Sequence, residues 1–456
     1  MQPRQVKTAA DARKIVEQRG LTHVKVGAVD VDGIVRGKYM AREKFFSALE
    51  NGFGFCDVVL GWDSNDQLVD GLTYTGWHTA YPDAPVRVLP DTCREVPTEG
   101  NNMLMFLSEF ADKAEAVCPR GTLRRVLKRA KDMGFSVYSA FEYEFFLFAE
   151  TPDSVRAKNY RDLKPITPGF FGYSALRSSV HADFYHELLT LCEQMDMRIE
   201  GLHTETGPGV LEAAIMVDEA LNAADKAILF KLFTKVLAQK RGWMATFMSK
   251  WSKDWPGQSG HIHLSLKDKK GNSVFYDPKA KHRMSKAMRH FIAGQQKLMP
   301  EFLGMVAQTV NAYTRLIPGF WAPTDATWGV ENRTTALRVI PGSAKSQRVE
   351  YRIAAADANP YIILAAALGS GLYGIEHELE PEKMVEGNSY AIKHPARLAL
   401  PRTLWDSAQA LKKSKAGREL FGDAFVDHYA ATREWEEREY RKAITDWQLQ
   451  RYFEII

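Results

Sequence analysis

Two carboxylates lie two positions apart in the apolar stretch SAFEYEFFLF, residues 139–148. Alternate side chains of a β-strand point to the same face, so Glu142 and Glu144 share one face while Phe141 and Tyr143 lie on the other. Burying unpaired carboxylates is costly, and this stretch therefore predicts cations close to the strand. A strand with one face in water is the alternative explanation of the same alternation.

Polar residues alternate in the same way in two later stretches. His261 and His263 share one face in SGHIHLSL, and Arg348, Glu350 and Arg352 share one face in QRVEYRI. For either stretch alone, a solvent-facing strand surface is the simpler interpretation. The repetition of charged faces on otherwise apolar strands favours one buried site to which all of them contribute.

Glu205 and Glu212 flank a Gly-Pro-Gly turn in HTETGPGVLE and extend the set of possible metal ligands. The members of the full set offer carboxylate or imidazole donors and are Glu142, Glu144, Glu205, Glu212, His261 and Glu350. A set of five Glu and one His without Cys suits Mg²⁺ or Mn²⁺ better than structural zinc. Six ligands predict more than one ion.

Basic residues are concentrated between positions 315 and 352. They are Arg315, Arg333, Arg338, Lys345, Arg348 and Arg352. Guanidinium groups clamp phosphates and carboxylates, so their position beside metal-binding carboxylates predicts a phosphoryl-transfer site. A surface ion-pair network is the alternative for any one of them alone. The chain has no G-x-x-x-x-G-K-[ST] motif and no kinase-type glycine loop, so ATP would bind in another kind of cradle.

The elements that must position these residues are predicted from periodicity. A helix is expected over residues 8–19, and an alternating stretch with a turn at Asp32-Gly33 predicts a hairpin. The runs VRVLPD and NNMLMFLSEF (residues 101–110) are strand-like, and from about residue 121 long helices alternate with strands up to a helical tail. We predict an α+β fold with an N-terminal domain over residues 1–112 and a larger domain over residues 113–456.

Composition narrows the class of protein. The chain has 456 residues, and its 60 basic and 56 acidic residues leave a net charge of only +4, which argues against a nucleic-acid partner. The four Cys lie far apart and predict reduced thiols in a cytoplasmic protein. The polar N-terminus is not typical of a signal peptide, and the apolar segment after Pro360 is shorter than the ~20 residues that span a bilayer, so no membrane partner is expected.

Six segments resemble, in their order and spacing, the signature segments of class I-like glutamine synthetases. They are EYE, HTETGPGVLE, SGHIHLSL, NAYTRLIPGF, ENRTTALRV and RVEYRIAAADANPY. The resemblance implies a small N-terminal β-grasp domain and a catalytic domain with a curved antiparallel sheet, a half-barrel flanked by helices. It also implies a reaction: the γ-carboxylate of L-glutamate attacks the γ-phosphate of ATP, and an amine or ammonia displaces phosphate from the resulting acyl phosphate.

The resemblance further implies roles for individual residues. The ion on the glutamate and amine side would be bound by Glu144, Glu205 and Glu212. The ion on the ATP side would be bound by Glu142, His261 and Glu350. The glutamate substrate would be bound by Gly260, Arg315 and Arg352, and the transferring phosphoryl group by Arg333 and Arg338. The nucleotide would contact His263, Ser265, Lys345 and Arg348.

The family assembles as stacked rings in which the small domain of one subunit completes the site of its neighbour. The resemblance therefore implies a homo-oligomer, a dodecamer of two hexameric rings. Asp63, in GWDSNDQ, would be the acid that the small domain contributes toward the amine. A turn aspartate in a polar loop explains Asp63 equally well.

The chain departs from the family at one position of the site. Members that use ammonia carry a Glu two residues after R-L-x-P-G, and this Glu closes over the site and helps to deprotonate ammonium. Here the sequence is RLIPGFWAP, with Trp321 in that position. The change predicts a nucleophile with an organic substituent, such as methylamine, which Trp321 contacts by packing or by a cation–π interaction of ~0.5–2 kcal/mol. Alternatively, Trp321 only packs the loop and ammonia is used.

Two other classes of protein fit the residues less well. A non-catalytic relative of the same fold would not be expected to retain all six metal-ligand types. A metal-dependent phosphatase or amidohydrolase would be expected to carry a clustered H-x-H plus Asp ligand set. The sequence therefore favours a γ-glutamylamine-forming branch of the family, with glutamine synthesis from ammonia as the alternative.

Overall fold

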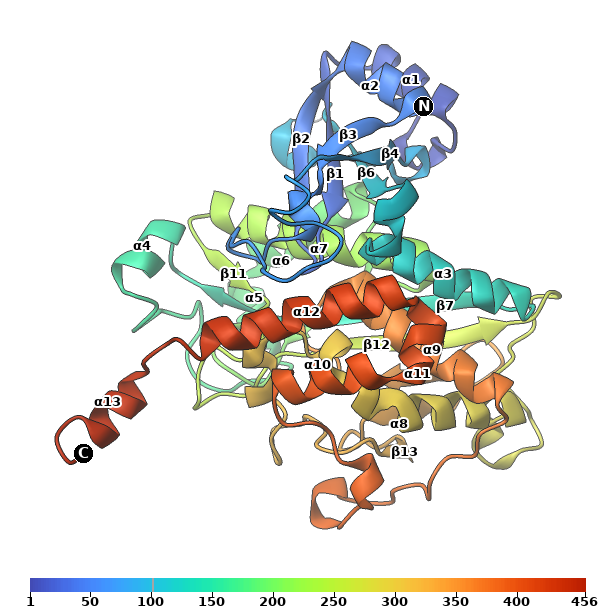
Figure 1. The fold of residues 1–456 in the computed structure, drawn as a ribbon, viewed down its shortest axis with the longest axis vertical. Coiled ribbons are helices and arrows are strands. Elements are labelled where there is room, and N and C mark those ends of the chain that lie inside the picture. The colour runs from blue at the N-terminus through green and yellow to red at the C-terminus, as the bar shows by residue number, and fades with distance from the viewer. Residues whose placement is uncertain (101) are drawn as a thin grey trace.

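The structure, a computed structural model, describes residues 1–100 and 102–456. Its N-terminal part is built on a six-stranded sheet with the order β2-β1-β6-β4-β3, in which β5 pairs with β6. The strands are β1 (His23–Val29), β2 (Val35–Ala41), β3 (Phe53–Cys56), β4 (Asp83–Val88), β5 (Arg94–Glu95) and β6 (Leu104–Phe110). The helices are α1 (Ala9–Gln18) and α2 (Arg42–Asn51), and Figure 1 shows both at one end of the molecule.

Local signals account for most of these elements. α1 begins at a capping box, in which the Thr8 hydroxyl accepts a hydrogen bond from the Asp11 N–H and the Asp11 carboxylate accepts one from the Thr8 N–H. The predicted hairpin is confirmed, since β1 and β2 pair antiparallel around Gly33, which has a φ of +81°. α2 was not predicted, because it follows β2 directly and has no capping side chain. Position 101 of the NNMLMFLSEF run lies outside the described residues.

The larger part is built on a nine-stranded sheet with the order β13-β14-β15-β12-β7-β9-β8, in which β10 and β11 pair with β7. The first strands are β7 (Ser136–Phe148), β8 (Ile199–Thr204), β9 (Val210–Ile215), β10 (Asp218–Glu219) and β11 (Met244–Thr246). The remaining strands are β12 (Gly260–Lys267), β13 (Trp328–Val330), β14 (Leu337–Ile340) and β15 (Arg348–Tyr351). In the described part of this sheet, neighbouring strands pair antiparallel, except for β13 and β14, which pair parallel. The predicted α+β class with a large antiparallel sheet is confirmed, whereas the boundary at residue 112 and the β-grasp topology stay predictions.

Helices surround this sheet (Figure 1). In the first half they are α3 (Pro119–Asp132), α4 (Pro152–Ala157), α5 (Ala175–Val180), α6 (Ala182–Gln194) and α7 (Ala220–Lys240). In the second half they are α8 (Lys286–Val306), α9 (Pro360–Glu376), α10 (Leu404–Lys413), α11 (Lys415–Phe421), α12 (Asp423–Tyr440) and α13 (Asp446–Tyr452). The helical tail is interrupted between α12 and α13, and α13 projects from the body. Among the described residues, no helix is long and apolar enough to cross a membrane.

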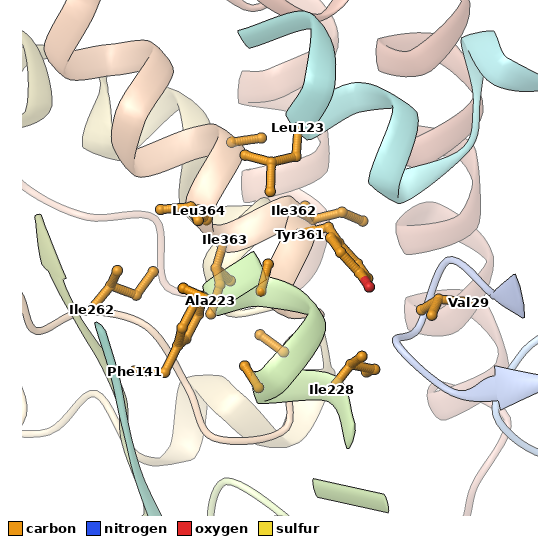
Figure 2. Packing of buried hydrophobic residues seen from close by; sticks show 14 of the residues in the cluster. Val29, Leu123, Phe141, Ala223, Ile228, Ile262, Tyr361, Ile362, Ile363 and Leu364 are labelled. Carbon is orange, nitrogen blue, oxygen red and sulfur yellow. The ribbon is translucent and has the colours of Figure 1, made fainter. Parts of the chain in front are cut away.

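One face of the central strands packs on α7 and α9. Figure 2 shows Phe141 of β7 and Ile262 of β12 beside Ala223 of α7 and Ile363 of α9. Phe141 and Tyr143 are buried, as the alternation in residues 139–148 predicts. A fixed back face leaves the opposite face of β7, with its two carboxylates, directed into the site.

A buried ion-pair network joins the two parts of the chain. Arg120 of α3 donates to Asp225 of α7 at 2.9 and 3.0 Å and to Glu109 of β6 at 2.8 Å. The hydroxyl of Tyr361 on α9 also donates to Asp225, at 2.7 Å. Burial opposes the charged form of Glu109, but the Arg120 guanidinium outweighs it and holds the pKa of Glu109 below its usual value. Removing Arg120 would leave two buried carboxylates without their main partner.

We therefore expect Arg120→Ala to lower the free energy of unfolding by ~3–5 kcal/mol, measured by urea denaturation. Because the pKa of Glu109 in the folded variant would rise, protonation would remove its unpaired buried charge, and the difference in stability between variant and wild type should shrink as the pH falls. Arg124→Ala is the matched control, because Arg124 pairs with Glu109 from a half-exposed position. Equal and small losses in both variants would contradict the role of the network.

Candidate active site

The register of the central strands brings the predicted ligands together. Glu142 of β7 lies opposite His261 of β12, and Glu144 of β7 lies opposite Glu212 of β9. On the other side of β12, Glu350 of β15 lies opposite His263. Residues directly opposite one another on neighbouring strands have Cβ atoms about 5 Å apart, which is close enough for two side chains to share an ion.

These side chains line a cavity of about 650 Å³. The predicted site residues that line it are Glu142, Glu144, Glu205, Glu212, His261, His263, Arg315, Trp321, Arg333, Arg338, Arg348, Glu350 and Arg352. Gly260 is part of β12 between two lining residues, and its N–H donates to the carbonyl of Ala354. The structure thus gathers most of the predicted site on one face of the sheet, while the role of each residue stays a prediction.

Three predicted residues lie outside this cavity. Ser265 and Lys345 are not among its lining residues, and Lys345 is exposed in the loop between β14 and β15. Asp63 caps its own turn, where its carboxylate accepts the N–H groups of Asn65 and Gln67 at 2.8 Å each. Within this chain Asp63 has the geometry of a turn aspartate, so a role at a neighbour's site stays a prediction.

The ligand set predicted for the ATP side is compact. His261 Nδ1 lies 3.4 Å from a carboxylate oxygen of Glu142 and 3.4 Å from one of Glu350. His263 Nε2 also lies 3.5 Å from Glu142, but its Nδ1 accepts a hydrogen bond from Arg348 Nε at 3.2 Å. That bond assigns the proton of a neutral His263 to Nε2, which would then donate to Glu142. The donor atoms of Glu142, His263 and Glu350 also lie within 4.8 Å of one another, as ligands of one ion would. The proton on Nε2 of His263 nevertheless makes His261 the better metal ligand of the two.

The ligand set predicted for the glutamate and amine side brings the carboxylates of Glu144, Glu205 and Glu212 together. One oxygen of Glu144 accepts hydrogen bonds from the N–H and the hydroxyl of Ser259. Burial raises the pKa of Glu212 far above its usual value, and the charges of Glu142 and Glu144 add to this effect. Divalent ions such as Mg²⁺ or Mn²⁺ bind to clusters of carboxylate oxygens, because the charge of the ion offsets the repulsion between them. The residues therefore fit the ions that the sequence predicts.

Arginines surround the opposite end of the cavity. Glu350 accepts a hydrogen bond from Arg338 Nη1 at 3.0 Å and another from Arg352. Burial opposes the charged form of Glu350, but Arg352 outweighs it and lowers the pKa of Glu350 to about 2. The buried Nε of Arg352 has no hydrogen-bond partner among the described residues. Arg315 is held by the carbonyls of Ile353 and Arg352, at 3.0 and 3.1 Å, so both guanidiniums are fixed beside the cavity.

Aromatic side chains form the mouth of the cavity. Trp321 has a φ of +59°, is 58% exposed and lines the cavity together with Phe320 and Tyr173. The left-handed backbone of a bulky residue costs ~1–3 kcal/mol, and such strain is concentrated at functional sites. The Nζ of Lys250 lies 4.7 Å from the centre of the Phe320 ring and steadies the same loop.

His203 and Tyr173 are two of the residues around the cavity that were not predicted from the sequence. His203 of β8 lies opposite Glu212 and 3.3 Å from Glu205, and the Tyr173 ring stacks on it at 4.3 Å. The alternation of His203 with Glu205 in HTET was the available signal. Tyr173 belongs to an irregular segment without periodicity, so no pattern pointed to it.

If the two ligand sets are distinct, Glu142→Ala should mainly impair phosphoryl transfer and Glu144→Ala mainly glutamate and amine handling. We expect a fall in kcat of about 100-fold or more for Glu142→Ala, since a lost ion removes several kcal/mol of charge stabilisation. For Glu144→Ala we expect a rise in KM for glutamate or amine. Steady-state kinetics of phosphate release measure both effects.

Glu200→Ala is the control for these variants, because Glu200 is an exposed carboxylate on β8. It should behave as the wild type. Equal and mild effects of Glu142→Ala and Glu144→Ala would indicate that both carboxylates belong to a solvated strand face and bind no ion.

Comparisons with known proteins agree with this geometry. The model of the glutamine synthetase catalytic domain matches residues 116–452. Type-1 glutamine synthetase 2 of Dictyostelium discoideum is 44% identical over 438 residues, which cover 95% of this chain and 84% of that protein. Glutamate–isopropylamine ligase of a Pseudomonas species is 35% identical over 449 residues, 97% of each chain. The solved structure of a GmaS/ADP complex superposes with a TM-score of 0.85 at 24% identity, over 97% of this chain and 99% of that one, and supports the fold.

Proposed function

This chain belongs to the glutamine synthetase family of ATP-dependent, amide-forming ligases, and from that premise we propose that its nucleophile is an organic primary amine. The substituent would be a neutral alkyl group, as in methylamine or isopropylamine. The products would be a γ-glutamylamide, ADP and phosphate. Glutamine formation from ammonia is the alternative, since the Dictyostelium relative carries the name of a glutamine synthetase.

The observation that carries this proposal is the lack of a spare carboxylate at the cavity. The acidic residues that line it are Glu142, Glu144, Glu205, Glu212 and Glu350. All five belong to the predicted metal-ligand sets, so among the described residues that line this cavity none is left to attract ammonium or the second ammonium group of a diamine. The one further acid that we invoke, Asp63, would come from a neighbouring subunit as a proton acceptor. Trp321, Phe320 and Tyr173 present aromatic surface instead, which favours an apolar substituent by burial of its methyl groups.

One of the two relatives supports the same class of substrate. The Pseudomonas protein, which matches this chain over nearly all of both lengths, is a ligase of isopropylamine by name. Its substituent is branched, apolar and without charge, as the aromatic mouth of this cavity would require. The residues of the mouth therefore offer a physical reason for a likeness in substrate.

Binding of glutamate and ATP would be governed by the fixed arginines. Arg315 and Arg352 would bind the carboxylates of glutamate, and the unpaired Nε of Arg352 offers a donor for this purpose. Divalent ions, Mg²⁺ or Mn²⁺ and two per site, would neutralise the phosphates and the γ-carboxylate when bound by the two ligand sets. Without such compensation, the two anions would repel each other at reacting distance.

Phosphoryl transfer would follow from this alignment. A γ-carboxylate oxygen attacks the γ-phosphorus, the bond to the β-phosphate oxygen breaks, and ADP leaves. Arg333 and Arg338 line the cavity and would neutralise the charge on the transferring oxygens. Arg338 is held by Glu350 and Glu331, so its guanidinium needs little reorganisation during the reaction.

Amide formation would take place at the aromatic mouth. The amine nitrogen attacks the carbonyl carbon of the acyl phosphate, phosphate leaves with the electron pair of the C–O bond, and the nitrogen loses a proton. Asp63 of a neighbouring subunit would accept this proton if the protein assembles as two stacked hexameric rings. Trp321 would exclude water, which would otherwise hydrolyse the acyl phosphate.

The amine proposal is tested by measuring glutamate- and ATP-dependent phosphate release with ammonia, methylamine, isopropylamine and 1,4-diaminobutane. We expect a kcat/KM for one of the two alkylamines at least tenfold above that for ammonia, and a lower value for the diamine. Mass spectrometry of the amide product separates coupling from hydrolysis. A clear preference for ammonia would overturn the proposal.

Trp321 should determine this preference. Trp321→Glu restores a carboxylate where ammonia-using members carry one, so we expect kcat/KM for ammonia to rise and that for the alkylamine to fall by at least tenfold. Trp321→Phe is the matched control and should retain most of the alkylamine activity. If Trp321→Glu left the ratio of the two substrates unchanged, the residue would have no part in amine selection.

A further inference from the structure

A histidine continues the row of carboxylates that crosses the sheet. His203 of β8 lies opposite Glu212 of β9, which in turn lies opposite Glu144 of β7. The Nε2 of His203 is 3.3 Å from an oxygen of Glu205 and 3.9 Å from an oxygen of Glu212. The ligand set implied by the family resemblance contains only carboxylates at this site, so the histidine is an addition of a different chemical type.

The spacing of these three donors is that of ligands around one ion. Bonds of about 2.1 Å to an octahedral ion place adjacent ligands about 3.0 Å apart and opposite ligands about 4.2 Å apart. The donor atoms of His203, Glu205 and Glu212 lie within 4.8 Å of one another, and the two distances from the imidazole fall between these limits. The structure therefore brings the nitrogen to the position of a ligand without a rearrangement of the strands.

The surroundings fix the imidazole in this position. The ring of Tyr173 stacks on it with a centre-to-centre distance of 4.3 Å and an interplanar angle of 15°. The carboxylate of Glu144, by contrast, lies toward Ser259, just before β12, and one of its oxygens accepts hydrogen bonds from both the N–H and the hydroxyl of Ser259. His203 is thus well placed to be a ligand of the ion that Glu205 and Glu212 bind, although it is not among the predicted ligands.

We propose that His203 is a nitrogen ligand of the divalent ion bound by Glu205 and Glu212, and that it gives this site a preference for Mn²⁺ over Mg²⁺. Imidazole binds transition ions well, whereas Mg²⁺ selects oxygen donors. His203 would thus act on the choice of metal, whichever amine the protein uses.

The test is metal binding by the full chain after removal of ions with EDTA. Titration with Mn²⁺, followed by the electron paramagnetic resonance signal of free Mn²⁺, gives its affinity, and competition gives that of Mg²⁺. For His203→Gln we expect one class of Mn²⁺ site to weaken at least tenfold and Mg²⁺ binding to change less than threefold. Gln keeps a hydrogen-bond donor near Glu205, so a role limited to that hydrogen bond would leave Mn²⁺ binding unchanged and overturn the proposal.

His181→Gln is the control, because His181 contacts Trp243 and not the cavity. Its two affinities should match those of the wild type. Equal losses of Mn²⁺ and Mg²⁺ affinity in His203→Gln would also overturn the proposal, since they would indicate a general distortion of the site.

A measurement on the wild type keeps the inference testable if the variant does not fold. Protein labelled with ¹⁵N-histidine and loaded with two equivalents of Mn²⁺ reports bound nitrogen through the hyperfine coupling of the metal. We expect directly bound histidine nitrogen on both ions, one from His261 and one from His203. Coupling on only half of the manganese would show that the second site has carboxylate ligands alone.

Discussion

The carboxylates of Glu142, Glu144 and Glu212 lie on adjacent strands in one cavity. The groups around them must offset the electrostatic repulsion between these carboxylates. Protonation would relieve it, as the raised pKa of Glu212 shows, but a protonated site could not bind cations. The guanidiniums of Arg338 and Arg352 compensate only the Glu350 end. The negative charge of the other carboxylates favours the binding of divalent ions. A site with bound cations beside fixed arginines is suited to bringing two anionic substrates together.

This concentration of charge is tolerated because the rest of the sheet is held in one register. Phe141 and Tyr143 alternate with the carboxylates on β7 and are buried, Phe141 beside α7 and α9 and Tyr143 against Phe230 of α7. A slip of one residue would bury Glu142 and expose the aromatics, which the hydrophobic core opposes. The packing of the back face therefore positions the front face, and the same strands serve stability and chemistry.

The sequence predicted which side chains share a face of a strand better than it predicted which residues lie opposite one another on paired strands. Alternation shows that Glu142 and Glu144 point the same way, but not that Glu212 lies opposite Glu144. That register depends on the long-range pairing of β7 with β9, and His203 lies opposite Glu212 because of the turn that joins β8 to β9. Likewise, Ser265 shares a face with His263, yet two residues add about 6.6 Å along a strand, and Ser265 does not reach the cavity. Helix α2 could not be predicted from a capping signal, because no side chain caps its N-terminus at Ala41.

The proposed choice of nucleophile depends on Trp321, which lines the cavity and, by the family resemblance, takes the position of a carboxylate in members that use ammonia. The most direct measurement is a competition in one vessel, with glutamate, ATP, and ammonium, methylamine and isopropylamine at equal concentration. The ratios of the amide products, read by mass spectrometry, equal the ratios of the kcat/KM values. We predict that the amide of one of the two alkylamines forms in at least tenfold excess over glutamine. An excess of glutamine would contradict it.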